Sequence, residues 1–98
     1  MLVYVAHPYG GKERNKRDVE NIIRHWAMEQ RSDITFISPI HTFGYMYRDV
    51  LYETGINMCL ELLKKCDYLI VCKNWENSRG CNIEVNFAKS NNIPIKFI

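Results

Sequence analysis

One stretch, residues 67–84, limits what this chain can fold into more than any other part of the sequence. Residues 68–72 form a short apolar run of β-formers without polar alternation, as expected for a strand covered on both faces. Residues 73–80 are polar and rich in turn formers, which predicts a loop at the strand's carboxyl end. A helix over residues 80–90 should follow. The stretch therefore predicts the strand–loop–helix unit of a parallel α/β sheet.

Glu84 breaks the pattern of that helix. Glu84, Phe87 and Ala88 are spaced i, i+3 and i+4, so they share one helical face. Because Phe87 and Ala88 should face the sheet, the Glu84 carboxylate should face it too, and such rule-breaking is concentrated at functional sites. An ionised glutamate in a crevice can act as a nucleophile on a sugar carbon or as a general base. The alternative is a glutamate that only stabilises the helix start.

The remaining segments complete an alternating βαβαβαβ order. Strands are predicted over 2–6, 33–38 and 93–98, and helices over 13–30 and 48–65; residues 39–47 are predicted as an aromatic-rich loop. Five residues should lie on the inward face of the second helix: Leu51, Met58, Cys59, Leu62 and Leu63. The 98 residues fit one domain, and this order predicts a three-layer, flavodoxin-like or Rossmann-like sandwich: a four-stranded parallel sheet with helices on both faces.

In such sheets the site lies beyond the carboxyl ends of the strands, so residues 7–14, 39–47 and 73–80 should meet the start of the last helix. Gly10 and Gly11, with the basic Lys12 and Arg14 beside them, suit an anionic group such as a phosphate; an ordinary βα turn is the alternative. Ser78 could have either of two roles: its hydroxyl could bind a phosphate, or it could cap the following helix. His41 lies in the aromatic loop. It is either a catalytic group or a solvated or hydrogen-bonded histidine without a catalytic role.

Composition restricts the partners. The net charge of +2 does not by itself imply nucleic acid, although a basic helical turn is present at Lys12, Arg14, Lys16 and Arg17. No apolar run approaches a membrane span, and no signal peptide is recognised. The chain is therefore expected to be cytoplasmic, without a membrane partner. Reduced, mostly buried thiols are expected, with a zinc site as the less favoured alternative, at Cys59, Cys66, Cys72 and Cys81.

Two segments carry a family resemblance. Residues 3–8, followed by Gly10 and Gly11, resemble the opening of the nucleoside 2-deoxyribosyltransferase-like superfamily. Residues 66–71, and residues 78–88 with their Ser-x-Gly-x-x-x-Glu spacing, resemble its later motif. The resemblance extends over nearly the whole chain and is closest to small, often phage- or bacterium-encoded domains.

The resemblance implies a chemistry. In that superfamily the glutamate at the position of Glu84 attacks the anomeric carbon of a 2-deoxyribosyl group and expels the base, and a tyrosine at the position of Tyr4 orients it. Members that act on nucleoside 5′-monophosphates have a serine at the position of Ser78 and a glycine-rich loop, both touching phosphate. The resemblance thus implies that Glu84 and Tyr4 are catalytic. The motifs and the resemblance together predict seven substrate-binding residues: His7, Pro8, Gly10, Gly11, His41, Ser78 and Gly80.

We therefore expect N-glycosidic cleavage or deoxyribosyl transfer, with a nucleotide substrate, a homodimer, and neither a metal nor an organic cofactor. Among the residues that carry the chemistry, the chain departs from the superfamily at Cys59, which stands where the family has an aspartate that handles the proton of the leaving base. The competing hypothesis is a non-catalytic binder of a nucleotide or a nucleotide-derived signal. A nucleic-acid-binding module is a third, less favoured one, since the basic turn is offset by Glu13, Asp18 and Glu20.

Overall fold

The computed structural model describes residues 1–29 and 33–98. A four-stranded, all-parallel sheet has the order β2-β1-β3-β4 and comprises β1 (Leu2–Ala6), β2 (Thr35–Ile37), β3 (Tyr68–Val71) and β4 (Ile95–Phe97). The main helices are α1 (Glu13–Glu29), α3 (Tyr52–Lys64) and α4 (Arg79–Ser90). The α/β class and the parallel sheet expected from the sequence are confirmed.

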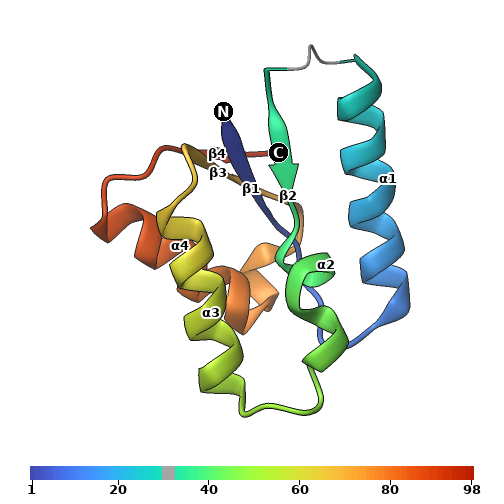
Figure 1. Cartoon of the computed structure of the whole chain (residues 1–98), viewed down its shortest axis with the longest axis vertical. Coiled ribbons are helices and arrows are strands. Elements are labelled where there is room, and N and C mark those ends of the chain that lie inside the picture. The colour runs from blue at the N-terminus through green and yellow to red at the C-terminus, as the bar shows by residue number, and fades with distance from the viewer. Residues whose placement is uncertain (30–32) are drawn as a thin grey trace.

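Helices cover both faces of the sheet (Figure 1). Tyr4 and Ala6 of β1 contribute to a core with α3 and α4, whereas Val5 packs with Val19 of α1 and Cys72 on the opposite face. This division follows from the pleat, because successive side chains of a strand point to opposite sides. Both central strands are buried on both faces, which explains their continuous apolar sequences.

The strand order creates a switch point between β1 and β3. The chain leaves β1 through α1 to reach β2 on one side, and then crosses back through α3 to β3 on the other side. Since crossovers between parallel strands are right-handed, opposite directions put the helices on opposite faces. The loops that follow β1 and β3 then separate and leave room for a ligand at their carboxyl ends.

The structure corrects the expectation for residues 39–47. They do not form a loop but a short helix, α2 (Pro39–Phe43), followed by a 3₁₀ turn, η1 (Gly44–Met46). Ser38 caps α2 with its side-chain oxygen and Pro39 occupies the first turn, where its missing N–H group costs nothing. The aromatic residues of this segment are therefore held on a helical turn.

The helix expected over 48–65 begins at Tyr52 instead. The backbone N–H groups of Asp49 and Val50 bond to the carbonyl of Met46, so these residues continue the preceding turn. Leu51, expected on the inward face, is extended and 78% exposed, which corrects that assignment. The edge strands β2 and β4 are also shorter than expected, while Gln30, the predicted last residue of the first helix, lies outside the described residues.

Candidate active site

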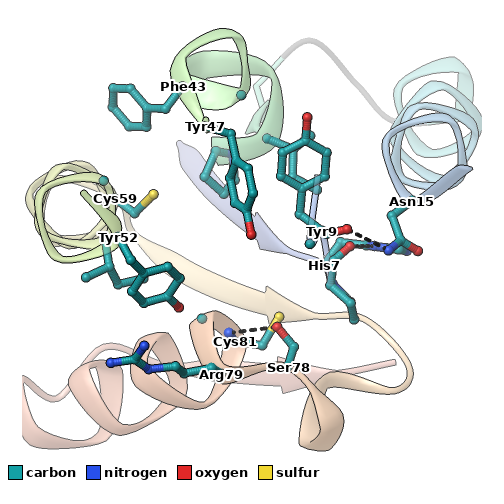
Figure 2. A pocket seen from close by; sticks show the side chains of 18 of the residues that line it. His7, Tyr9, Asn15, Phe43, Tyr47, Tyr52, Cys59, Ser78, Arg79 and Cys81 are labelled. Atoms are coloured by element: carbon teal, nitrogen blue, oxygen red, sulfur yellow. Dashed lines mark hydrogen bonds between the residues drawn. The ribbon is translucent and has the colours of Figure 1, made fainter. Parts of the chain in front are cut away.

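A cavity of about 420 Å³ opens at the switch point. It is lined by the loop after β1, by α2 and η1, by the start of α3 and by the start of α4. Figure 2 shows Tyr52 and Cys59 projecting from α3 on one side, Tyr9 and Tyr47 on the other, and Ser78 and Cys81 on α4. The volume is in the range of small-molecule sites, roughly 300–1,000 Å³. The segments that the sequence expected to converge do converge.

Glu84 lies at the buried end of this cavity. It projects from the second turn of α4, is only 5% exposed, and lines the cavity. The hydroxyl group of Tyr4, from the centre of β1, donates a hydrogen bond to Glu84 Oε2. Tyr4 is fully buried and does not itself line the cavity, but it contacts Glu84, which does. The structure thus joins the two residues expected to be catalytic, although they are 80 positions apart in sequence.

The environment of this pair changes its acidity. Burial raises the pKa of Glu84 to about 7, and the hydrogen bond from Tyr4 opposes the rise. Burial and the nearby negative charge of Glu84 raise the pKa of Tyr4 well above its usual value. Tyr4 therefore stays protonated and acts as a donor, while Glu84 titrates close to neutral pH. A carboxyl group in this state can serve as a nucleophile or as a proton carrier.

Two thiols share the cavity with Glu84. Burial raises the pKa of Cys59 to about 11, and the charge of Glu84 adds to the rise. Burial likewise raises the pKa of Cys81 to about 12. All four cysteines of the chain are free in the structure. Both cavity thiols are therefore neutral, and their weak acidity argues against a role as nucleophiles.

The loop after β1 supplies a rigid wall. His7 is buried, and its two ring nitrogens lie 2.7 Å from the Pro8 carbonyl oxygen and 2.6 Å from Asp18 Oδ2. Asn15 fixes the same loop by donating from Nδ2 to the carbonyl oxygen of Tyr9. His7, Pro8 and Gly10 line the cavity as expected.

Gly10 and Gly11 both have positive φ angles, 59° and 72°, which explains the glycine pair. Gly10 has open space where a side chain would be, and Gly11 lies against the side chains of Tyr47 and Arg48. Only Gly10 of the two lines the cavity.

The start of α4 forms the opposite wall. Ser78 caps this helix by accepting a hydrogen bond from the backbone N–H of Cys81, so its capping role is shown. Gly80 lies under Tyr52, whose hydroxyl oxygen would be 3.2 Å from an added Cβ atom. The guanidinium of Arg79 stacks 4.4 Å from the centre of the Tyr52 ring. Ser78, Arg79, Gly80 and Tyr52 all line the cavity.

Some cavity residues were not found from the sequence. Tyr52 and Arg79 were missed because each begins a helix whose exact start was uncertain, and side-chain direction depends on that start. Tyr47, in contrast, was expected near the site, and its ring meets Tyr9 edge-on with the ring centres 4.9 Å apart. Trp75 lies in the segment 73–80 that was expected at the site, but its ring packs against Phe97, with 5.3 Å between the ring centres.

Unlike the expected site residues that line the cavity, His41 lies in a different groove. It lines a second, shallower groove together with Ser38 and Glu20. Its Nδ1 is 2.8 Å from Ser38 Oγ, and its Nε2 is 2.7 Å from Glu20 Oε2. The helical turn of α2, which the sequence did not predict, directs His41 away from the cavity that contains Glu84.

Neither a metal-binding cluster nor a membrane-spanning helix is present among the described residues. Across residues 1–29 and 33–98, no three His, Cys, Asp or Glu side chains gather as a metal site requires. Within the same ranges, no helix has both the length and the apolar character needed to cross a bilayer.

The fold and the cavity define a doubly wound, parallel α/β domain with a ligand-sized site at its switch point. The chain belongs to the family described as "Domain of unknown function (DUF7768)", whose model matches residues 1–98. No curated protein matches the chain.

Proposed function

We propose that this protein cleaves the N-glycosidic bond of a nucleoside 5′-monophosphate, or transfers its sugar, with Glu84 as the nucleophile. The observation that carries the proposal is the buried Glu84 carboxyl group, which is held by Tyr4 and lines a nucleotide-sized cavity at the switch point. The resemblance of the sequence motifs to nucleoside 2-deoxyribosyltransferase-like proteins supports the same chemistry. The proposal places a sugar carbon beside Glu84.

The reaction proceeds by double displacement. A carboxylate oxygen of Glu84 attacks C1′, the C1′–O bond forms, and the bond to the base breaks with its electron pair passing to the base. Water or a second base then attacks C1′ from the vacated side, the C1′–O bond to Glu84 breaks with its electrons returning to the carboxylate, and the proton lost by the attacking molecule passes by way of solvent to the departed base. Tyr4 holds the attacking carboxylate in position by donating to Oε2. Since the pKa of Glu84 is raised to about 7, turnover should increase with pH through neutrality as the carboxylate forms.

The remaining cavity residues fit the rest of a nucleotide. The start of α4, with Arg79 beside it, and the Gly10 loop, with Lys12, present positive groups and backbone toward the cavity from two sides. These groups suit the 5′-phosphate. Tyr47 and Phe43 line the part of the cavity formed after β2 and are suited to cover the base.

The test is a panel of nucleoside 5′-monophosphates, with ribose and deoxyribose and with neutral and charged bases, followed by chromatography of the free base. Each compound is incubated with and without acceptor bases. We expect release from at least one compound by the wild type, none by Glu84→Gln, and unchanged release by the control Glu20→Gln. Release from none of the panel would overturn the proposal.

A second candidate is a non-catalytic nucleotide binder. The observation that favours it is the neutral Cys59 thiol beside Glu84, which provides no obvious acid for a leaving base. A binder would retain nucleotide affinity in the Glu84→Gln variant and show no base release in the wild type. Calorimetry with the same panel separates the two candidates.

The proposal includes a homodimer in the cytoplasm. Three large apolar side chains near the cavity are exposed, Tyr45 at 81%, Leu51 at 78% and Tyr47 at 40%, and a second copy would cover them. Light scattering on the purified chain tests the dimer: a monomer mass at the concentrations where the protein is active would overturn this part of the proposal.

A further inference from the structure

The acid–base groups around Glu84 restrict which substrates the proposed reaction can use. Glu84 is the one carboxyl group among the described residues that line the cavity. Retaining glycosidases normally use two, one as the nucleophile and one as the acid that protonates the leaving group. If Glu84 attacks the sugar, the proton taken up by the leaving base must come from another group. Otherwise the substrate must be one whose base leaves without a proton.

The groups facing Glu84 hold their protons too tightly for this task. They are the Tyr4 hydroxyl on β1, the Cys59 thiol and the Tyr52 phenol on α3, and the Cys81 thiol on α4, whose pKa burial raises to about 12. Burial raises the pKa of Cys59 to about 11 and raises the pKa of Tyr52 above its usual value, with the stacked Arg79 opposing the rise at Tyr52. An efficient general acid has a pKa near the operating pH, so these groups are poor donors to a leaving base.

The histidine and the two cationic side chains of the wall are turned elsewhere or exposed. Both ring nitrogens of His7 are engaged, one with the Pro8 carbonyl oxygen and one with Asp18, so neither points an N–H into the cavity. Arg79 stacks on Tyr52, and Lys12 is exposed.

We propose that the substrate of this cavity is an N-glycoside whose base is already positively charged, such as a pyridinium or an N7-alkylated purine. This inference rests on the proposed function and deepens it. The positive base departs as a neutral molecule, so no proton donor is needed in the step that breaks the bond.

The reaction balances without a further reactant. The Glu84 carboxylate forms a bond to C1′, and the C1′–N bond breaks with its electron pair neutralising the positive ring. Water then attacks C1′, the sugar–Glu84 bond breaks with its electrons returning to the carboxylate, and the proton lost by water passes to solvent. The net change converts a cationic glycoside and water into a neutral base, a free sugar phosphate and one proton.

The charges of the cavity fit such a substrate at both ends. A positive ring next to Glu84 favours the ionised carboxylate that the attack requires, and the surrounding tyrosine faces attract cations. The Arg79–Tyr52 stack shows this type of contact within the wall. The negative 5′-phosphate would lie toward the positive Arg79 and Lys12, and the positive base would lie toward the negative Glu84. The charges of substrate and cavity are therefore complementary.

Two matched substrate pairs test the inference on the unaltered protein. The first is 7-methyl-2′-deoxyguanosine 5′-monophosphate against 2′-deoxyguanosine 5′-monophosphate, and the second is nicotinamide mononucleotide against its reduced, uncharged form. Each pair keeps nearly the same shape and differs in the charge of the base. Each rate is divided by the hydrolysis rate without enzyme in the same buffer, which removes the intrinsic lability of the charged compounds.

We expect base release only from the charged members, or undivided kcat/KM values that favour them, in at least one pair. After division by the uncatalysed rates, the neutral member of a pair should show no more acceleration than the charged member, because no acid protonates its base. A neutral member whose divided rate exceeds that of its charged partner by roughly 10²–10⁴, the usual contribution of a general acid, would reveal a proton donor. That result would overturn this inference and leave the proposed function intact. Release from none of the four, with release from another nucleotide of the wider panel, would overturn this inference alone; release from no compound of the panel would overturn both.

The variant Cys59→Asp provides a second, independent measurement, with Cys59→Ser as its matched control. A carboxyl group at this position faces Glu84 and can protonate a leaving base. We expect Cys59→Asp to increase turnover of the neutral members about tenfold or more relative to Cys59→Ser, without a similar gain for the charged ones. An equal effect on both members of a pair would count against the inference. Circular dichroism of both variants confirms that they are folded before the rates are compared.

Discussion

The protein contains two hydrogen-bonded networks built around a glutamate, and their environments differ. In one, Glu84 is 5% exposed and is paired with the neutral hydroxyl of Tyr4 inside the cavity. In the other, Glu20 has a side chain that is 32% exposed and is paired with His41, which in turn contacts Ser38. Both lie near the carboxyl ends of strands, but only the first is in the cavity.

The comparison shows what decides the protonation of a carboxyl group. The hydrogen bond and positive charge of His41 lower the pKa of Glu20, because water and a partner both stabilise its charge. Burial raises the pKa of Glu84 to about 7, and a single neutral donor does not reverse the effect. Glu20 is therefore a surface ion-pair member, and Glu84 has the perturbed acidity that is typical of reacting groups.

The largest difference is expected in activity. Replacing Glu84 by Gln removes the nucleophile, so base release from the best substrate should fall by at least about 10³-fold. Replacing Glu20 by Gln should change it less than about twofold, because Glu20 lies in the other groove. Initial rates at pH 7.5 measure both. Similar losses in the two variants would remove the distinction between the two networks.

The same pair should differ in how stability depends on pH. Glu84 has a higher pKa in the folded state, about 7, than the usual value of 4.5 for a glutamate, so the folded state binds this proton more tightly. Its contribution is fully present below pH 4.5 and is lost as pH rises through 7, about 3 kcal/mol in all. Glu84→Gln should lack this loss and be the more stable protein at pH 8.

Glu20 should show the opposite sign. Because its pKa is lowered in the folded state, it stabilises the fold above its unfolded value, and this contribution disappears as pH falls. Urea unfolding of the wild type, Glu84→Gln and Glu20→Gln between pH 4 and 8 provides the comparison. If the stability of Glu84→Gln had the same pH dependence as that of the wild type, the pKa of Glu84 would be close to its usual value. Glu84 would then not be buried as described.

Tyr4→Phe should have an intermediate effect. The substitution keeps the buried ring and removes the donor to Glu84, so the free energy of unfolding should fall by about 1–3 kcal/mol. Loss of the donor also raises the pKa of Glu84 further, since this bond lowers it. The rising limb of the pH–rate profile should therefore move to higher pH, a shift that a purely structural role would not produce. An unmoved profile would contradict the orienting role.

The smallest effects are expected at the two helix caps. Ser78 caps α4 and Ser38 caps α2, each accepting a backbone N–H, so either Ser→Ala change should cost about 1 kcal/mol of stability. Only Ser78 lines the cavity, so only Ser78→Ala should also raise KM for a nucleotide with a 5′-phosphate. Thermal melts and KM values for a nucleoside and its monophosphate separate the two effects.

The sequence predicted the features that depend on continuous patterns. The two central strands are apolar throughout, the 3.6 period placed Glu84 inward, and alternation of strands and helices gave the parallel sheet. The site followed because these elements converge at the switch point.

The features that depend on local hydrogen bonding were not predicted. The cap formed by Ser38 and Pro39 makes residues 39–43 helical and carries His41 to another groove. The turn after Met46 delays the start of α3, which exposes Leu51 and brings Tyr52 to the cavity. Both effects are decided by one or two hydrogen bonds, which leave almost no trace in hydrophobic periodicity.

The most direct test of the central claim is to trap the sugar on Glu84. A 2′-deoxy-2′-fluoroarabinosyl analogue of nicotinamide mononucleotide slows the second displacement, so the covalent intermediate should accumulate. Mass spectrometry after acid quenching and digestion should find the fluorosugar phosphate on the peptide that contains Glu84, and none in Glu84→Gln. Release of nicotinamide from this analogue with no adduct, or with the adduct on another residue, would contradict the account.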